Sequence, residues 1–453
     1  MIAMNSDLHT RLQSALDSLS PPPLIKSYGR LIRVNGLTLT ATGGQFAIGE
    51  KYQVESVDGV WYDVEVIGFN QAEAYLMPLK KAQNLCSGGR VRPAAKVSTV
   101  AISEKLLGRV VDAQMQPIDN LGDLDKDDTV NLSKLPKDYS LTPLERKGVT
   151  EPLDVGIRAI NSLFSVGKGQ RLGLFAGSGV GKSKLLGMMT RYTSADVVIV
   201  SLVGERGWEV KEFIEQSLGK EGLKKAIVIA SPADDSPLLR IKAAELSHRL
   251  AAFFRDQNLN VLLLMDSLTR YAQAQREIGL SVGELPASKG YPPSVFSKLT
   301  QLVESSGNSE KSKGSMTAIY TVLAEGDDQQ DPIADNARAI LDGHIVLDRT
   351  LAEKGHYPAI NIGASISRVM PNIVTPEQLD YCYKLKKLYS RYMQVHELIP
   401  LGAYQAGKDP ELDSAVALYP KIESFLCQGL NEKFDFAQSA KQLNDVMGKL
   451  NVK

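Results

Sequence analysis

Leu172-Gly-Leu-Phe-Ala-Gly-Ser-Gly-Val-Gly-Lys-Ser183 is the stretch that decides the fold of this chain. It reads as an apolar strand, a glycine-rich turn and a helix that begins at Lys182-Ser183. A turn of this kind points successive backbone N–H groups and the N-terminus of the following helix at one anion. The stretch therefore predicts a phosphate-binding loop, with a nucleoside triphosphate as the ligand.

Each residue type in this loop has a chemical reason. Lys182 is spaced to reach the β- and γ-phosphates, and the hydroxyl of Ser183 is placed to bind Mg²⁺. One departure is visible, because Ala176 stands where the strict pattern has its first glycine. The residues expected to surround the phosphates are Gly177, Ser178, Gly179, Val180, Gly181, Lys182 and Ser183.

Length and composition indicate a large protein with balanced charge. The chain has 453 residues, with 52 Lys and Arg against 52 Asp and Glu. Two or three domains are expected at this length, and the balance predicts no global attraction to nucleic acid or to anionic membranes. The three cysteines lack metal-ligand spacing. With no run long enough for a membrane helix and no readable secretory signal, we expect a cytosolic protein.

The pattern of apolar and polar residues changes along the chain, and this predicts an α/β multidomain protein. Short alternating runs between Leu31 and Arg92 favour a small β-barrel. In the centre, β-rich runs alternate with helical stretches, which favours a mostly parallel sheet. After Pro376 the pattern is helical. The expected segments are 1–23, an N-terminal amphipathic helix and linker; 24–97, the barrel; 98–372, the nucleotide-binding domain; and 373–453, a C-terminal helical domain.

The first segment carries Leu8, Leu12, Leu16 and Leu19 on one helical stripe. A stripe of this kind docks on a partner or a membrane surface in some proteins and packs back on its own domain in others. The sequence alone leaves both interpretations open.

Two carboxylates are candidates for the chemistry beside the phosphates. Val261-Leu-Leu-Leu-Met-Asp266 is a buried strand that ends in a carboxylate, the arrangement that holds the Mg²⁺ shell in phosphoryl transfer. Glu205 follows the strand after the phosphate-loop helix, so it faces the ligand crevice at the carboxyl edge of a parallel sheet. It is a candidate for polarising the attacking water. The structural alternatives are a plain strand exit for Asp266 and a pairing of Glu205 with Arg206.

Tyr357 and Arg368 are less informative on physical grounds alone. Tyr357, which precedes a proline, can offer an aromatic face to a base or simply pack. Arg368 can be a structural ion-pair residue.

Several motifs in order resemble the type III export ATPases, relatives of the catalytic heads of rotary ATP synthases, and most of all the flagellar branch. The resemblance is specific from about residue 100 onward and weaker before it. The motifs that carry it are Phe175–Ser183, Gly204-Glu-Arg-Gly207, Gly290-Tyr-Pro-Pro-Ser-Val-Phe296, Gly326-Asp-Asp328, Ile340-Leu-Asp-Gly-His-Ile-Val-Leu347, His356-Tyr-Pro-Ala-Ile360 and Ser365-Ile-Ser-Arg-Val-Met370.

This resemblance implies a RecA-like nucleotide-binding domain and a role for each candidate. Ser183 and Asp266 would hold Mg²⁺, Lys182 the phosphates of ATP, and Glu205 would orient and activate water. Tyr357 would stack on adenine, and Tyr404 would close its other side. Arg368 would be an arginine finger that reaches the nucleotide of the neighbouring subunit.

The resemblance also implies partners and a location. Members of this family form homohexameric rings, so we expect a homo-oligomer at the cytoplasmic face of the inner membrane. Its expected partners are a central stalk protein, export-gate membrane proteins, chaperone–substrate complexes and a flagellar export regulator bound through the N-terminal helix. No nucleic acid partner is expected.

Three positions depart from the family pattern. Trp208 stands where Arg is usual, Asn161 where Asp is usual and Met115 where Gly is usual.

Three other functions stay open besides flagellar export. They are a virulence (injectisome) secretion ATPase, an RNA-translocating ring of the transcription-terminator type, and a non-catalytic nucleotide-binding ring subunit.

Overall fold

The computed structural model describes residues 28–94, 99–102, 104–124, 129–131, 141–323, 331–399 and 404–448. The described residues divide into two compact units. The first comprises residues 28–78 and 82–94, and the second comprises residues 79–81 and the described residues from 99 onward. The predicted helix over residues 6–19 lies outside the described residues.

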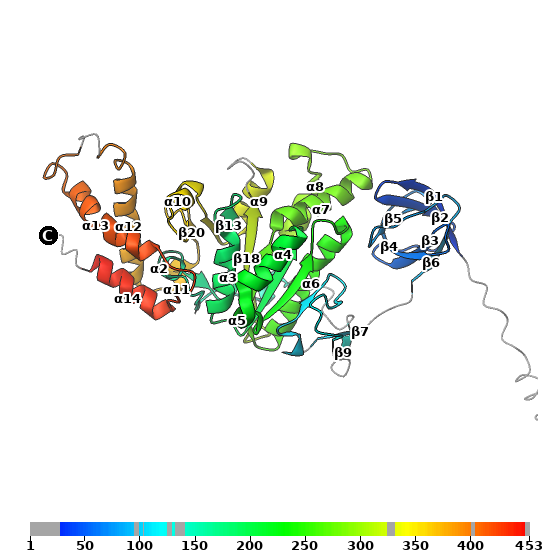
Figure 1. The fold of residues 1–453 in the computed structure, drawn as a ribbon, viewed down its shortest axis with the longest axis horizontal. Coiled ribbons are helices and arrows are strands. Elements are labelled where there is room, and N and C mark those ends of the chain that lie inside the picture. Colours follow the sequence, from blue (N-terminus) through cyan, green and yellow to red (C-terminus); the bar gives the residue numbers. More distant parts are fainter. Residues whose placement is uncertain are drawn as a thin grey trace, which may run out of the picture. The chain divides into compact units, whose positions relative to one another are not determined.

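The first unit is a closed antiparallel barrel, drawn in blue in Figure 1, which confirms the predicted barrel. Its interior is filled by alternate aliphatic side chains of the strands, such as Leu31, Val54, Val64, Leu76 and Val91. Irregular register in β1 and β4 bends these strands, as closure of a small barrel requires. In barrel order, the strands are β1 (Gly29–Asn35), β2 (Thr38–Thr42), β5 (Glu73–Pro78), β4 (Trp61–Asn70), β3 (Lys51–Glu55) and β6 (Arg90–Pro93).

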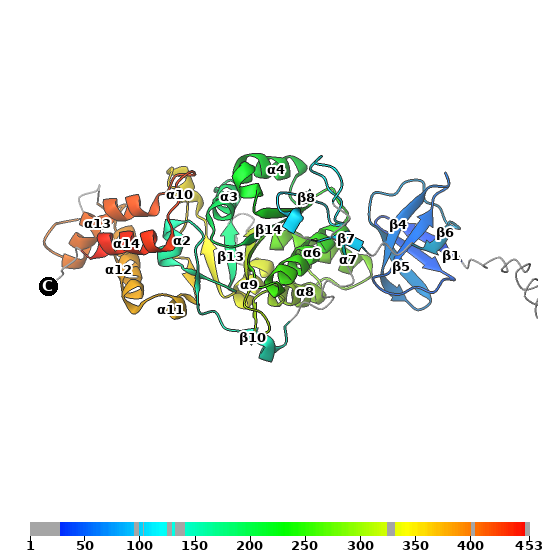
Figure 2. The ribbon, with the colours of Figure 1, turned by 90° about the horizontal axis from the view of Figure 1, so that it is seen from below.

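The second unit is built on a mostly parallel sheet, as predicted (Figures 1 and 2). Its central strands are almost wholly apolar and buried because helices cover both faces of a parallel sheet. Among the described strands of this one sheet, only β20 at its edge runs antiparallel to its neighbour. The strand order is β20 (Ile366–Ser367), β19 (Gly343–Val346), β13 (Arg171–Ala176), β18 (Ser315–Leu323), β16 (Asn260–Asp266), β14 (Val197–Val203), β15 (Ala226–Ser231) and β8 (Val110–Val111).

Helices connect these strands and pack on them. The long helix α6 contacts β14, β15, β16 and β18, and α7 and α9 also contact β18. A π-helical segment over Phe213–Leu218 separates α4 from α5. The helices are α3 (Lys182–Tyr192), α4 (Gly207–Glu212), α5 (Gly219–Leu223), α6 (Pro237–Asp256), α7 (Leu268–Ser281), α8 (Pro293–Glu304), α9 (Pro332–Ile340) and α10 (Arg349–Glu353).

Short ribbons and 3₁₀ turns complete the second unit. The 3₁₀ turns cover Glu104–Leu106, Pro143–Glu145 and Ser288–Gly290. The two-stranded ribbons pair β7 (Thr99–Ala101) with β9 (Thr129–Asn131), β10 (Arg146–Lys147) with β17 (Asn308–Ser309), and β11 (Pro152–Leu153) with β12 (Val166–Gly167).

The C-terminal part is helical, as expected, and shares its core with the sheet domain. Its helices are α11 (Met370–Ile373), α12 (Pro376–Met393), α13 (Pro410–Leu426) and α14 (Phe436–Met447). The last three pack around α2 (Arg158–Leu163), and one hydrophobic cluster continues from the sheet domain into them. Because compactness alone does not separate these two parts, the domain boundary drawn between residues 372 and 373 stays a prediction.

The departure at Asn161 has a structural reason. Its side chain is fully buried on α2. The amide nitrogen donates to Asp154 Oδ1 at 2.8 Å and to the carbonyl of Phe434 at 3.1 Å, while Oδ1 accepts from the N–H of Val155 at 3.2 Å. An aspartate here would place a second carboxylate against Asp154 and would leave the Phe434 carbonyl without this donor.

We therefore expect Asn161→Asp to lower the free energy of unfolding by about 2–3 kcal/mol, because the change removes two donors from a buried site and adds a like charge. Urea denaturation measures this loss. The double variant Asp154→Asn/Asn161→Asp reverses the pair and is expected to recover part of it. An Asn161→Asp chain as stable as the unaltered protein would contradict the assignment.

The departure at Met115 carries a backbone cost. Met115 has a φ of +62°, in the left-handed region where a glycine is the least strained residue. It is also buried. The packing of the buried methionine side chain therefore offsets the backbone strain that a glycine would avoid at this position.

Candidate nucleotide site

The phosphate loop has the conformation that its glycines predict. It leaves the sheet at the end of β13 and enters α3 at Lys182. Gly179 and Gly181 have φ values of +80° and +90°, which only glycine adopts without strain. Ala176 is the last residue of β13 and is buried in the strand, so an alanine fits where the strict pattern has a glycine.

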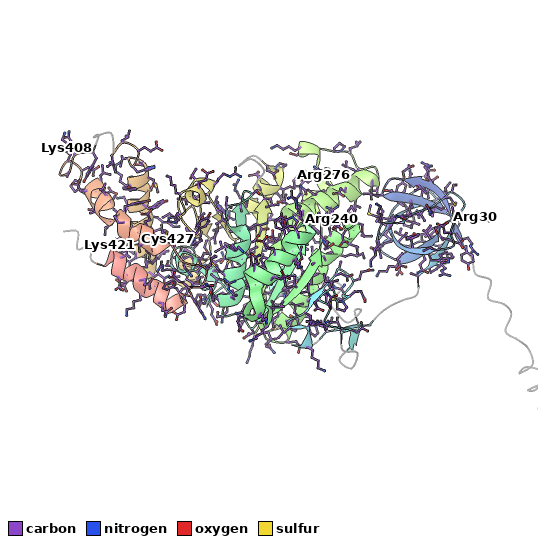
Figure 3. The ribbon with its side chains drawn as sticks, viewed as in Figure 1. Arg30, Arg240, Arg276, Lys408, Lys421 and Cys427 are labelled. Carbon is purple, nitrogen blue, oxygen red and sulfur yellow. The ribbon has the colours of Figure 1, made fainter. Side chains whose placement is uncertain are left out.

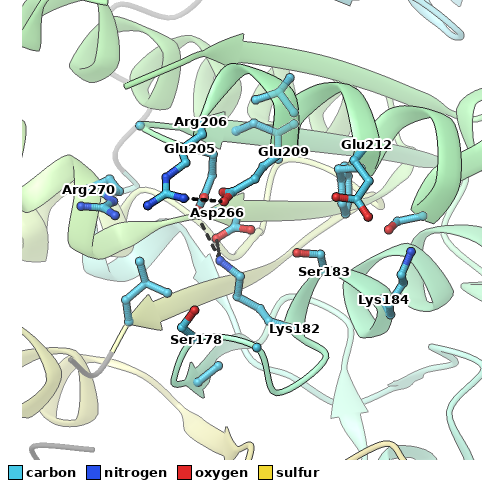
Figure 4. A pocket seen from close by; sticks show the side chains of 18 of the residues that line it. Ser178, Lys182, Ser183, Lys184, Glu205, Arg206, Glu209, Glu212, Asp266 and Arg270 are labelled. Atoms are coloured by element: carbon cyan, nitrogen blue, oxygen red, sulfur yellow. Dashed lines mark hydrogen bonds and ion pairs between the residues drawn. The ribbon is translucent and has the colours of Figure 1, made fainter. Parts of the chain in front are cut away.

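Two neighbouring strands, β16 and β14, bring the predicted carboxylates to one edge of the sheet. Asp266 is the last residue of β16, and Glu205 comes two residues after the end of β14. Figure 4 shows both carboxylates beside the ammonium of Lys182. The Lys182 Nζ lies 2.7 Å from Asp266 Oδ1 and 3.2 Å from Glu205 Oε1. The hydroxyl of Thr321, on β18, donates to Asp266 Oδ1 at 2.6 Å.

Burial sets the electrostatics of this cluster. Burial raises the pKa of the Asp266 carboxyl, against the opposing effect of the Lys182 charge. Burial by itself lowers the pKa of the Lys182 ammonium, but the charges of Asp266 and Glu205 outweigh it and the pKa is raised. Lys182 thus stays protonated and is the cation that two carboxylates share.

The residues at this edge fit a magnesium ion that arrives with a nucleotide. The oxygen donors are the Asp266 carboxylate and the hydroxyl of Ser183, both on the wall of the same cavity. Within the described residues, no group of three or more His, Cys, Asp or Glu side chains is suited to hold a metal by itself. A small set of oxygen ligands is typical of Mg²⁺, which keeps several waters and shares the phosphates of its substrate.

The cavity above the phosphate loop has a volume of about 730 Å³. It is lined by the loop itself, by Glu205 and Asp266, and by the basic side chains of Arg206, Arg270 and Arg349. Trp208 also lines the cavity and is 61% exposed. The Trp208 departure therefore replaces a usual cation at the rim with an exposed aromatic ring.

Tyr357 lies against the phosphate loop, a contact that the sequence does not reveal. A methyl group at Gly181 would sit 3.4 Å from the Tyr357 ring. The ring is 44% exposed and also lines a second cavity of about 540 Å³. This second cavity is also lined by Cys427, Gln428 and neighbouring residues that follow α13. Sequence reasoning missed these residues, because nothing in their order marks them as neighbours of Tyr357.

Two predicted residues lie apart from both cavities. The Tyr404 hydroxyl donates to Asp413 Oδ1 at 2.7 Å, and Tyr404 is not among the residues that line either cavity. Arg368 follows the edge strand β20 and donates to the carbonyls of Leu341 and Arg338, both at 3.2 Å. The structure therefore does not bring Arg368 to the phosphate loop of its own chain.

The parallel sheet, the phosphate loop and the convergent carboxylates define the class of P-loop nucleotide-binding proteins. Residues 156–367 match the nucleotide-binding domain of the ATP synthase alpha/beta family, and residues 374–445 match the T3SS EscN ATPase C-terminal domain. The flagellum-specific ATP synthase of Pseudomonas aeruginosa is 54% identical to this chain over 440 residues, which cover 96% of this chain and 97% of that protein. The chain belongs to the type III export ATPase family and is an ATPase.

Solved structures agree with this family. The assembled ATPase EscN from the enteropathogenic E. coli type III secretion system superposes with a TM-score of 0.85 at 40% identity, covering 92% of this chain and all of that chain. EscN in complex with its central stalk EscO gives a TM-score of 0.83 at 39% identity, with the same coverage. The predicted family and fold class are confirmed, while the roles of individual residues stay predictions.

No helix in the described part of the chain has the length and apolar character needed to cross a bilayer.

Proposed function

We propose that this ATPase acts as a Mg²⁺-dependent homohexameric ring that energises or assists the export of flagellar proteins across the cytoplasmic membrane. One observation carries the catalytic part of the proposal. Lys182, Glu205 and Asp266 meet beside the phosphate loop, whereas Arg368 of the same chain lies elsewhere. The export role is supported by the 54% identity to a flagellum-specific ATP synthase.

The proposed chemistry begins with a change of partner at Lys182. Bound phosphates attract the ammonium away from Glu205 and Asp266. Asp266 and Ser183 would then hold Mg²⁺, which supplies positive charge to neutralise the phosphates. Asp266 needs such a cation to stay ionised once Lys182 has moved, because burial raises its pKa. Glu205, released from Lys182, orients and polarises the attacking water.

The remaining roles concern the base and the transition state. Tyr357 stacks on adenine beside the phosphate loop, which its contact with Gly181 supports. Tyr404, whose hydroxyl donates to Asp413 in the structure, is proposed to close the other side of the base. Arg368 of a neighbouring subunit stabilises the charge on the transferring phosphoryl group.

The proposed partners follow from the relatives. EscN is solved with its central stalk EscO, and we propose an equivalent stalk protein for this chain. We further propose chaperone–substrate complexes, export-gate membrane proteins and a regulator bound through residues 6–19 as partners, and a peripheral position at the cytoplasmic face of the membrane. The charge balance of the chain gives no support to a nucleic acid partner.

Deleting the gene and complementing it tests the export role. Flagellar filaments and secreted filament protein are expected to disappear, to return with the unaltered gene, and to stay absent with Lys182→Ala, since phosphate binding is lost. Lys220→Ala, on the surface of α5, is the matched control. Intact flagella with lost secretion of virulence effectors would instead favour the injectisome function. ATPase activity that RNA stimulates would favour the translocating ring.

A further inference from the structure

An arginine from outside the C-terminal domain binds several residues in and beside the wall of the second cavity. Arg158 begins α2, and its guanidinium reaches the turn that follows α13. Nε donates to the carbonyl of Phe425 at 2.6 Å, and Nη2 donates to the carbonyls of Ser424, at 3.0 Å, and of Cys427. Figure 3 labels Cys427 in this turn. One planar group thus binds three carbonyls at the end of one helix.

Two further contacts fix the guanidinium itself. Nη1 donates to Gln442 Oε1 on α14 at 2.9 Å, and the guanidinium carbon lies 4.4 Å from the centre of the Phe434 ring. Partial burial lowers the pKa of Arg158, because it disfavours the charged form. Carbonyl dipoles and an aromatic face oppose this effect and stabilise the half-buried guanidinium. Together, these hydrogen bonds and the contact with the Phe434 ring hold the turn against α2.

Gln428 connects this turn to Tyr357. The side chain is almost fully buried and every polar group has a partner. Oε1 accepts from the backbone N–H of Arg158 at 2.8 Å, and Nε2 donates to the carbonyls of Gly156 and Glu432, each at 2.9 Å. The backbone N–H of Gln428 donates to the carbonyl of Tyr357 at 2.9 Å. The contact path therefore runs from α2 through Gln428 to the backbone of Tyr357, whose ring lies on the phosphate loop.

Neither member of this pair reaches the phosphates. Arg158 and Gln428 line the second cavity together with Tyr357, and neither lines the cavity above the phosphate loop. Neither side chain is therefore placed to contact phosphates bound at the loop.

We propose that Arg158 and Gln428 are positioning residues that hold Tyr357 over the phosphate loop, so that the affinity for the nucleoside part of the ligand depends on how the C-terminal helices are held. The proposal rests on the proposed stacking of adenine on Tyr357. We call Arg158 and Gln428 the clamp. The proposal predicts a selective effect: weakening the clamp lowers the affinity for a nucleoside diphosphate and leaves the affinity for a bare diphosphate unchanged.

ADP and inorganic pyrophosphate are the matched probes, because they share the diphosphate and differ in the nucleoside. Gln428→Leu removes three side-chain hydrogen bonds at nearly constant volume. We expect its Kd for ADP to rise about tenfold, as the loss of one to two net hydrogen bonds would give, while its Kd for pyrophosphate stays within error of the unaltered chain. Arg158→Lys keeps the charge but lacks the planar guanidinium that binds several carbonyls at once. It is expected to change the Kd values for ADP and pyrophosphate in the same selective way. Calorimetry measures both constants.

Two controls make the result decisive. Gln394→Leu carries the same substitution at an exposed position at the end of α12 and is expected to bind both ligands as the unaltered chain does. Tyr357→Ala tests the underlying role: if it does not raise the Kd for ADP selectively, the proposed adenine stacking is wrong. If Tyr357→Ala raises that Kd and both clamp variants leave it unchanged, only the clamp is wrong. An equal loss of ADP and pyrophosphate affinity in both clamp variants also overturns the clamp, because it indicates a general loss of fold.

Discussion

Glu205→Gln is expected to lower kcat for ATP hydrolysis about 10²–10⁴-fold, the usual contribution of a positioned general base. Glutamine keeps the size of the side chain and removes the charge that polarises water. ATP affinity is expected to persist, since the phosphate loop, Lys182 and Asp266 are unaltered. Single-turnover hydrolysis and equilibrium binding of ATP, measured on the same preparation, separate the two effects.

The geometry around Lys182 sharpens this expectation. In the structure the ammonium lies closer to Asp266 than to Glu205, at 2.7 Å against 3.2 Å, so loss of the Glu205 charge leaves the stronger contact in place. Glu221→Gln, the same substitution at an exposed position on α5, is the control. A Glu205→Gln chain that hydrolyses ATP within a factor of about ten of the unaltered rate would assign the activation of water to another group.

The sequence predicts the fold well where one physical rule dominates. Unbroken apolar runs such as Val261–Met265 require burial on both faces, so they indicate parallel strands without further information. The phosphate loop is equally determined, because Gly179 and Gly181 adopt a backbone conformation that other residues resist. Asp266 and Glu205 follow from the rule that parallel strands present their carboxyl ends at one edge.

Contacts between distant segments are what the sequence does not reveal. Tyr357 reaches Gly181 across 176 positions, and Gln428 binds Gly156 across 272. The second contact accompanies the packing of α13 and α14 on α2, whereas the first joins two loops of the sheet domain. Periodicity reports which face of a helix is apolar, not which helix it meets. The same limit explains why Asn161 looks like an unexplained departure until its partners Asp154 and Phe434 are known.

Arg368→Ala is expected to reduce kcat about 10³–10⁵-fold in assembled rings, the usual contribution of an arginine finger. The structure supports a role in a neighbouring active site, because the guanidinium rests on the carbonyls of Leu341 and Arg338 beside the end of α9. Among the described residues no carboxylate forms a salt bridge with it, so the charge is available to an incoming phosphate. Arg368→Lys keeps the charge without the planar fork and is expected to recover only part of the rate.

Mixing two inactive chains distinguishes an arginine that acts between subunits from one that acts within its own. Glu205→Gln chains retain Arg368, and Arg368→Ala chains retain Glu205, so roughly one interface in four of a randomly mixed ring combines both intact groups. Activity is therefore expected to return on co-assembly and to fall when the mixture is diluted below the concentration at which rings form. Unaltered chains should show the same dependence on dilution. If rings that demonstrably contain both variants remain inactive, at least one of the two residues has a different role. If turnover per chain is constant across the assembly transition, a single chain contains the whole active site.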